Sequence, residues 1–356
     1  MKKPPSKEQA LFLQKIGEKR TERDRRKPKP KTSFQSNEET STSREEYKKW
    51  KQLSLPEKFC LDNYVQTVEA ISEVRESIIR EKIYINFDTI REIDTATAMM
   101  LAAELEVMKI TYKVSQMIAH DSHWDPKVRA LLVQMGFLEL LSAIPEISSH
   151  TEPSKNKIFV KFRSGHKLIG DSVVQILENL QKNITAGELS DDLLLHLCVG
   201  ISEAITNSYQ HAYRGDDRNE RIKLNRWWIS ASIDKQTKEI QVVCYDRGAT
   251  IPKTIKSSLF PILSEDEIIF TTIKEQKSST KSKNRGKGLS ELLHLIDENK
   301  QGTLRIYSGK GMVEFKRSRK KGENTDISRE LPRQMQGTLV EWSIIPYPST
   351  TTTETH

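Results

Sequence analysis

The order of apolar and polar residues in the first folded stretch of the chain predicts alternating helices and strands. The predicted elements are a helix at 63–81, a strand at 82–87, a helix at 94–108, a strand at 113–118 and a helix pattern at 128–141 that ends near Gly136 and Phe137. Asp94 or Thr95 is expected to cap the second helix, because short side chains with a hydrogen-bond acceptor suit that position. This order predicts a small α/β domain at 51–150.

A longer helical pattern covers residues 192–213. Its apolar positions share one face, and Glu203, Asn207 and His211 recur at every fourth position on another. Each step of four residues rotates by only about 40°, so these side chains form one slanted row. A carboxylate that acts as a base and an amide oxygen that binds Mg²⁺ would fit a metal–phosphate site. A solvated polar stripe is the alternative.

Two further segments place glycines next to polar groups. Asp246 ends a buried strand pattern, and Gly248 follows it, where a glycine permits close approach. Gly286 and Gly288 lead into a helix whose N-terminal N–H groups form an anion site. The predicted elements here are a strand at 241–246, a helix at 289–296, and strands at 302–308 and 337–344.

These three segments, in this order, resemble the motifs of the GHKL ATPase superfamily, which includes gyrase, Hsp90, histidine kinases and MutL. Residues 203–213 look like its N-box, 246–248 like its adenine-binding box and 286–289 like its phosphate-binding box. Within this superfamily, the chain most resembles the anti-sigma-factor kinases. It implies a GHKL (Bergerat) α/β sandwich at 155–348, with helices on one face of a mixed, mostly antiparallel sheet.

The resemblance also implies roles for individual residues. Asn207 would coordinate Mg²⁺ at the phosphates of ATP, Asp246 would recognise the adenine amino group, and Glu203 would act as a general base. The other implied nucleotide-binding residues are His211, Gly248, Arg285, Gly286, Lys287, Gly288 and Leu289. Thr250 and Ser290 stand where the family often has glycine, which leaves the side-chain contacts to ATP in place. Residues 252–283 would form the lid over the nucleotide.

The N-terminal part resembles the STAS domain of anti-sigma-factor antagonists in its order of strands and helices. In that family a strand-to-helix turn carries a phosphorylatable hydroxyl, so Thr95 is a candidate phosphosite, with a plain helix N-cap as the alternative. The expected fold class is α+β, a STAS-like domain followed by the GHKL domain. A loop with two histidines and two aspartates is interpreted as a polar turn rather than a metal site; these residues are His120, Asp121, His123 and Asp125.

Most of the net positive charge of the chain lies in its first 50 residues. The chain has 57 basic and 49 acidic side chains, a net of +8, but residues 1–50 alone have 15 basic and 8 acidic ones, a net of +7. This stretch and residues 349–356 are expected to be disordered tails. The basic tail is a candidate for nucleic-acid contact, although a solvated tail is the preferred interpretation.

The rest of the composition points to a cytoplasmic protein. No apolar run reaches the roughly 18 residues of a membrane span, and no secretion signal is visible. Three scattered cysteines form neither a disulfide framework nor a zinc site. Residues 274–287, at the end of the expected lid, have six basic side chains and one acidic, a net charge of +5. These cations would neutralise a triphosphate. The alternatives are contact with the DNA backbone or a solvated loop. Residues 316–321 are expected to form a basic surface hairpin.

Three functions remain open. The first is a regulatory switch of the anti-sigma or serine/threonine kinase type, which controls a protein partner through Mg-dependent ATP hydrolysis or phosphotransfer. The second is an ATP-driven conformational component of a multi-protein assembly, DNA-associated or of the defence type, in which a homodimer is an option. The third is a nucleotide-binding module without turnover. No His-containing dimerisation helix precedes the ATPase part, which disfavours a sensor histidine kinase.

Overall fold

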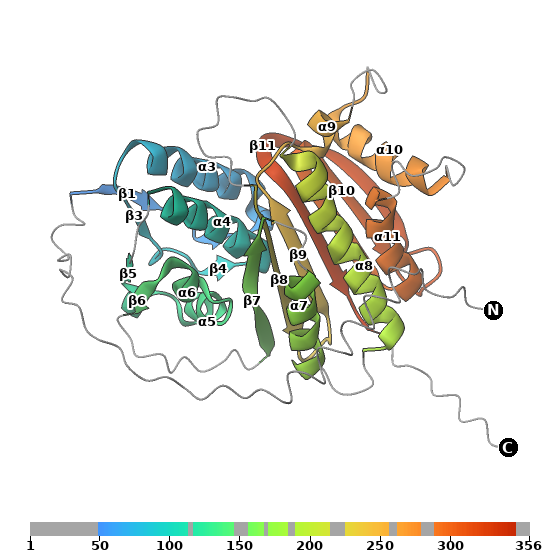
Figure 1. Cartoon of the computed structure of the whole chain (residues 1–356), viewed down its shortest axis with the longest axis horizontal. Coiled ribbons are helices and arrows are strands. Elements are labelled where there is room, and N and C mark those ends of the chain that lie inside the picture. Colours follow the sequence, from blue (N-terminus) through green and yellow to red (C-terminus); the bar gives the residue numbers. More distant parts are fainter. Residues whose placement is uncertain are drawn as a thin grey trace. The chain divides into compact units, whose positions relative to one another are not determined.

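A five-stranded antiparallel sheet forms the centre of the structure, a computed structural model. The structure describes residues 49–112, 117–145, 156–166, 170–183, 189–213, 225–255, 262–278 and 288–346. The strands are β7 (Lys157–Gly165), β8 (Trp227–Asp234), β9 (Ile240–Asp246), β10 (Gly302–Arg317) and β11 (Thr325–Ile344). Their order is β10-β11-β9-β8-β7 (Figure 1), and every neighbouring pair is antiparallel, where a mixed sheet was expected.

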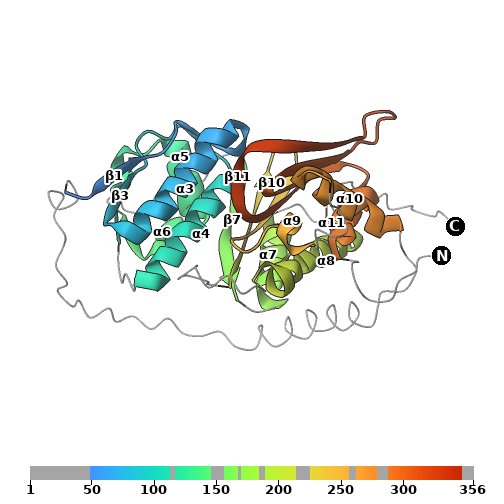
Figure 2. The same cartoon turned by 90° about the horizontal axis from the view of Figure 1, so that it is seen from above.

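Helices α7 (Gly170–Asn183), α8 (Asp191–Asn207) and α11 (Gly288–Asn299) lie along one face of this sheet (Figures 1 and 2). Ser190 caps α8, because its hydroxyl accepts a hydrogen bond from the Leu193 N–H at 3.1 Å. On β11, the indole N–H of Trp342 donates to the Leu292 carbonyl on α11 at 2.9 Å. Helix α10 (Glu265–Ser278) packs beside α11 and β10.

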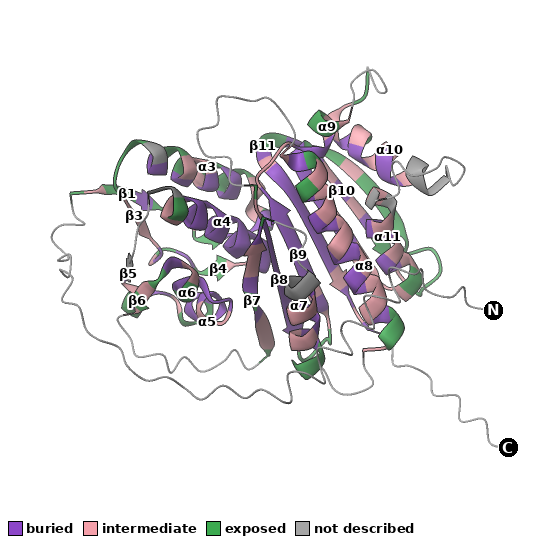
Figure 3. Cartoon of the chain, in the orientation of Figure 1, coloured by how far each residue is buried: buried purple, intermediate pink, exposed green. Residues whose placement is uncertain are grey.

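Two N-terminal helices, α3 (Tyr64–Arg80) and α4 (Thr95–Tyr112), cover the opposite face of the sheet. Helix α4 contacts β8 and β9, and α3 contacts β11. Residues 95–107 of α4 are all buried (Figure 3), which explains why most of the residues in this stretch are apolar. The sequence predicted helices on one face only; the second helical layer comes from the N-terminal part of the chain.

Short parallel strand pairs and two helices complete the N-terminal part. The pairs are β1 (Lys51–Ser54) with β3 (Ile83–Asn86), β2 (Lys58–Phe59) with β4 (Glu92–Ile93), and β5 (Met117–Ala119) with β6 (Ala143–Pro145). The helix predicted at 128–141 is two helices, α5 (Pro126–Gln134) and α6 (Phe137–Leu141), because Gly136 between them has φ of 77°. Asp94 caps α4, since its Oδ1 accepts from the Thr97 N–H at 2.6 Å.

One apolar core runs through both predicted parts of the chain. It joins buried residues of α3 and α4 to Trp228, Val243 and Tyr245 of the sheet. Trp50–His356 form one compact unit. The segment expected to link the two predicted domains, residues 151–157, lies outside the described residues up to residue 155, and Lys157 already begins β7. Both expected tails, apart from residues 49 and 50, also lie outside the described residues. Residues 316–321 span the end of β10 and the start of its connection to β11, and Lys316, Lys320 and Lys321 are exposed, as predicted. In the part of the chain that the structure describes, no helix has both the length and the apolarity that a bilayer crossing requires.

Candidate functional site

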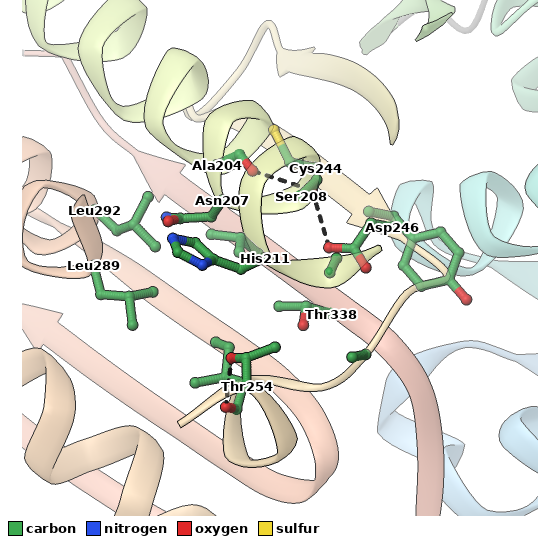
Figure 4. A pocket seen from close by; sticks show the side chains of 15 residues that line it. Ala204, Asn207, Ser208, His211, Cys244, Asp246, Thr254, Leu289, Leu292 and Thr338 are labelled. Atoms are coloured by element: carbon green, nitrogen blue, oxygen red, sulfur yellow. Dashed lines mark hydrogen bonds between the residues drawn. The ribbon is translucent and has the colours of Figure 1, made fainter. Parts of the chain in front are cut away.

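A pocket opens where α8, the end of β9 and the start of α11 meet (Figure 4). Asn207 and His211 line it from α8 and the following π-helical turn η3 (Ser208–Ala212), Asp246 from β9, and Leu289 from α11. Four predicted site residues from three distant segments therefore meet in one pocket. The other lining residues are Ala204, Ser208, Ala212, Cys244, Tyr245, Ala249, Ile251, Thr254, Leu292, Thr338 and Val340.

Asp246 is a buried carboxyl group in this pocket, with only 5% of the residue exposed. Its Oδ2 lies 2.9 Å from the Ser208 hydroxyl, and its Oδ1 accepts a hydrogen bond from the Gly248 N–H at 2.9 Å. Burial raises the pKa of Asp246 to about 7, although the Gly248 N–H, the Ser208 hydroxyl and the Thr338 N–H each lower it. A hydrogen-bond donor that enters the pocket would therefore favour the ionised carboxylate.

Gly248 packs against the backbone of the π-helical turn. A Cβ atom at this position would lie 2.4 Å from the Ala212 carbonyl oxygen, far inside contact distance. The next residue, Ala249, donates its N–H to the same oxygen at 2.6 Å. Any side chain at position 248 would push segment 247–249 away from the helix, so the glycine allows this wall of the pocket to close.

Asn207 and His211 lie on either side of a change in helix type. The chain leaves the α-helical period after Asn207 and forms the π turn, a feature that is frequent at functional sites. His211 is exposed at the pocket wall. The Nδ2 of Asn207 is buried, and it has no hydrogen-bond partner among the described residues. A buried amide without a partner is unusual, and here it borders a cavity.

Glu203 lies one helical turn before Asn207 and is not among the residues that line the pocket. Burial raises the pKa of Glu203, the negative charge of Glu291 on α11 raises it further, and Asn207 lowers it. A carboxylate whose pKa is raised toward neutrality is suited to proton transfer. The three residues of the predicted row therefore have different surroundings. Asn207 and His211 line the pocket, whereas Glu203 does not line it and is affected by the charge of Glu291.

The start of α11 borders the pocket through Leu289. Gly288 is the first residue of this helix, so the N–H groups of the first turn have no partners within the helix. Three predicted phosphate-binding residues, Arg285, Gly286 and Lys287, lie outside the described residues, as do residues 256–261 and 279–283 of the predicted lid. Lys274, at the basic end of that lid, pairs with Asp326 of β11 and does not line the pocket.

Thr338 and Ser208 line the pocket beside Asp246, and the sequence analysis missed both. Gly337 precedes Thr338 with φ of 75°, and a Cβ there would lie 1.8 Å from the Asp246 carbonyl oxygen. A glycine inside a strand pattern often marks such a close backbone approach, so Gly337 was the available signal. The Thr338 hydroxyl lies 2.8 Å from the Ser308 hydroxyl, which accepts from the Ile251 N–H at the start of α9 (Ile251–Thr254).

Thr250 occupies the position where the GHKL pattern has a second glycine. Its φ is −70°, an ordinary value, so the backbone needs no glycine here. The side chain is buried, with 2% of the residue exposed, and its methyl carbon lies 3.5 Å from where a Cβ on Gly309 would be. That distance is ordinary van der Waals contact, so the threonine does not depend on the glycine at position 309.

The other two candidate sites are structural features. Thr95 is 1% exposed, and its hydroxyl lies 3.4 Å from the Ser232 hydroxyl of β8, so a kinase cannot reach it in this structure. Asp121 forms a buried ion pair with Arg129 at 2.7 Å, and Asp125 caps α5. The described ranges contain no group of three or more His, Cys, Asp or Glu side chains that would hold a metal ion.

Comparison with protein-family models and curated proteins assigns the chain to no family. No protein-family model matches the chain, and no curated protein shows significant similarity to it. The site is therefore interpreted from its own residues.

Proposed function

We propose that this chain binds Mg·ATP in the pocket in the manner of GHKL ATPases, and that ATP controls its action on a protein partner. The observation that carries the proposal is the buried Asp246 carboxyl in a pocket that Asn207 and the first turn of α11 also border. These groups supply an acceptor for a base amine, an oxygen ligand for Mg²⁺ and N–H groups for phosphate.

The architecture agrees with the proposal. An antiparallel sheet with α7, α8 and α11 on one face supports a GHKL-type sandwich, and the parallel strand pairs with their helices support a STAS-like N-terminal part.

Asp246 would give the site its preference for adenine. An ionised carboxylate accepts hydrogen bonds but donates none, so it would bind the exocyclic amine of adenine and repel the carbonyl oxygen that guanine has at that position. Because the carboxylate is buried, a ligand without the donor would exclude water from it and leave it only its hydrogen bonds within the protein, such as those from Ser208 and Gly248. The remaining lining residues near it are mostly apolar or small, as a flat base requires.

Asn207 and Glu203 would serve the phosphate end. Because Asn207 lines the pocket, its amide oxygen would be the Mg²⁺ ligand. Bound Mg²⁺ would offset the negative charge of the phosphates. Glu203, with its raised pKa, would accept a proton from the attacking water or hydroxyl.

Turnover is favoured over simple binding. A module that only binds nucleotide has no use for Glu203 next to Glu291, because two nearby carboxylates disfavour each other's ionised forms. The burial of Thr95 argues against phosphotransfer to this turn of the same chain, so a partner in trans is the proposed target. An ATP-driven conformational role in a larger assembly is the alternative.

Calorimetric titration of the full chain with ATP and with GTP tests the proposal. We expect ATP to bind at least about tenfold more tightly than GTP, and EDTA to weaken ATP binding. Asn207→Ala should remove the effect of Mg²⁺, whereas Asn179→Ala on α7, a matched control, should keep it. A folded chain that binds no ATP would refute the proposal. With γ-labelled ATP, label on a partner would indicate a kinase, and free phosphate alone would indicate a switch ATPase.

A further inference from the structure

Arg247 lies between two residues of the proposed adenine site, but its side chain reaches the N-terminal helical layer. Its Nε donates to Oε1 of Glu104 on α4 at 2.9 Å. Arg75 of α3 donates to the same oxygen at 2.7 Å. Glu104 is 2% exposed, so one buried carboxylate on the far side of the sheet is shared between α3 and the segment that follows Asp246.

This segment, residues 247–249, is fixed by several contacts. The Arg247 N–H donates to the Tyr213 hydroxyl at 3.1 Å, and the Arg247 carbonyl accepts from the Gln336 side chain at 3.1 Å. At its other end, the Ala249 N–H is bonded to the π-helical turn. Among these described contacts, only the ion pair with Glu104 connects the segment to α4, so it is the link through which the N-terminal layer acts on the pocket wall.

A second carboxylate on α4, that of Glu106, has different partners from Glu104. Glu106, two residues further along, accepts from the Trp228 indole N–H at 2.5 Å and from the Ser164 hydroxyl at 2.9 Å, and pairs with Arg226 at 3.2 Å. These partners belong to β7, to β8 and to the residue before β8. Helix α4 therefore presents two buried carboxylates to the sheet, and Glu104 is the one that pairs with the segment after Asp246.

We propose that Glu104 is a positioning residue for the nucleotide site, which acts through Arg247 to hold segment 247–249 and Asp246 in their binding geometry. This inference rests on the proposed function. If α4 moved away from Arg247, the buried Glu104 carboxylate would lose one of its two arginine partners and keep Arg75, so the separation has an energetic cost that couples α4 to the pocket wall. By thermodynamic linkage, a partner protein that displaces α4 weakens nucleotide binding, and bound nucleotide holds α4 in place.

The test measures the affinity of full-length variants for ATP by calorimetry. We expect Glu104→Gln to raise the Kd by about fivefold or more. Asp121→Asn, which breaks the buried pair with Arg129 in the same N-terminal part, is the matched control and should leave the Kd within about twofold. Urea denaturation of both variants separates lost affinity from lost stability.

A double-mutant cycle tests whether Glu104 acts on the pocket through Arg247. Arg247→Gln should lose similar affinity, and the double variant should lose no more than the larger single loss, because both changes break the same link. If Glu104→Gln does not fold, Arg247→Lys replaces it, since lysine keeps the charge but lacks the guanidinium Nε. An unchanged Kd in the folded variant, additive losses in the cycle, or an equal loss in Asp121→Asn would each overturn the inference. If the wild type binds no ATP, the proposed function itself fails.

Discussion

Replacing Asp246 by asparagine should stabilise the fold at neutral and alkaline pH, although it removes the proposed adenine contact. The wild-type carboxylate is buried, and the amide has nearly the same shape. The asparagine oxygen can accept from the Gly248 N–H, and its NH₂ can donate to the Ser208 hydroxyl. That hydroxyl can turn its hydrogen to the Ala204 carbonyl, which is 3.1 Å away. The variant therefore avoids the cost of a buried charge and leaves these groups paired.

The pKa of Asp246 sets the size of the effect. Burial raises it from 3.8 to about 7. Below about pH 4 the carboxyl is neutral in both the folded and the unfolded chain. Between about pH 4 and 7 the unfolded chain releases the proton and the folded chain retains it, so the wild type loses stability relative to the variant. A pKa difference of about 3 corresponds to about 4 kcal/mol above pH 7, and to less than half of that at pH 5.

Urea denaturation of wild type and Asp246→Asn at pH 5, 6, 7 and 8 measures this difference. The advantage of the variant should grow with pH and level off above pH 7. Asp234→Asn is the matched control: the Thr237 and Gln236 N–H groups lower the pKa of Asp234, so its replacement should destabilise the fold at neutral pH. A free-energy difference for Asp246→Asn that stays constant from pH 5 to 8 would refute the reasoning.

Three other substitutions test the packing and the chemistry. Gly248→Ala should lower both Tm and ATP affinity, because the new Cβ would lie 2.4 Å from a carbonyl oxygen, whereas Gly200→Ala inside α8 should be tolerated in a thermal melt. Trp228→Phe should cost about 1–3 kcal/mol in urea denaturation, because it removes a donor from the buried Glu106 carboxylate; a stability equal to wild type would show that this bond is not needed. Glu203→Gln should keep ATP affinity and abolish phosphate release, and normal turnover in this variant would exclude Glu203 as the base.

Local patterns in the sequence predicted the elements of the site. The four-residue spacing of Asn207 and His211 and the polar end of the strand at Asp246 depend on neighbouring residues only, and the structure brings these three side chains to one pocket. The sequence placed a helix end near Gly136 but missed α6 as a separate helix, because helical periodicity does not register the positive φ between the two. Thr338 was missed because its place beside Asp246 depends on the pairing of β11 with β9.

Local sequence patterns could not predict that α3 and α4 form a second helical layer on the sheet, for a similar reason. Helix α4 is mostly apolar, which predicts burial but does not say against what. The two acidic residues in it, Glu104 and Glu106, were the visible anomaly, since buried carboxylates need partners. Those partners, Arg247 and Trp228, lie more than a hundred residues further along the chain. Only the tertiary structure connects them.

The affinity of Asp246→Asn for ATP, measured by calorimetry at pH 8, tests the central claim most directly. At this pH the wild-type carboxyl is mostly ionised, since its pKa is about 7, and it can accept from the adenine amine. We expect the variant to bind ATP at least about tenfold more weakly, a loss of about 1.4 kcal/mol or more, while Asp234→Asn binds as the wild type does. Because the variant is expected to be the more stable protein, unfolding cannot explain such a loss. An unchanged ATP affinity in Asp246→Asn would contradict the assignment of this pocket.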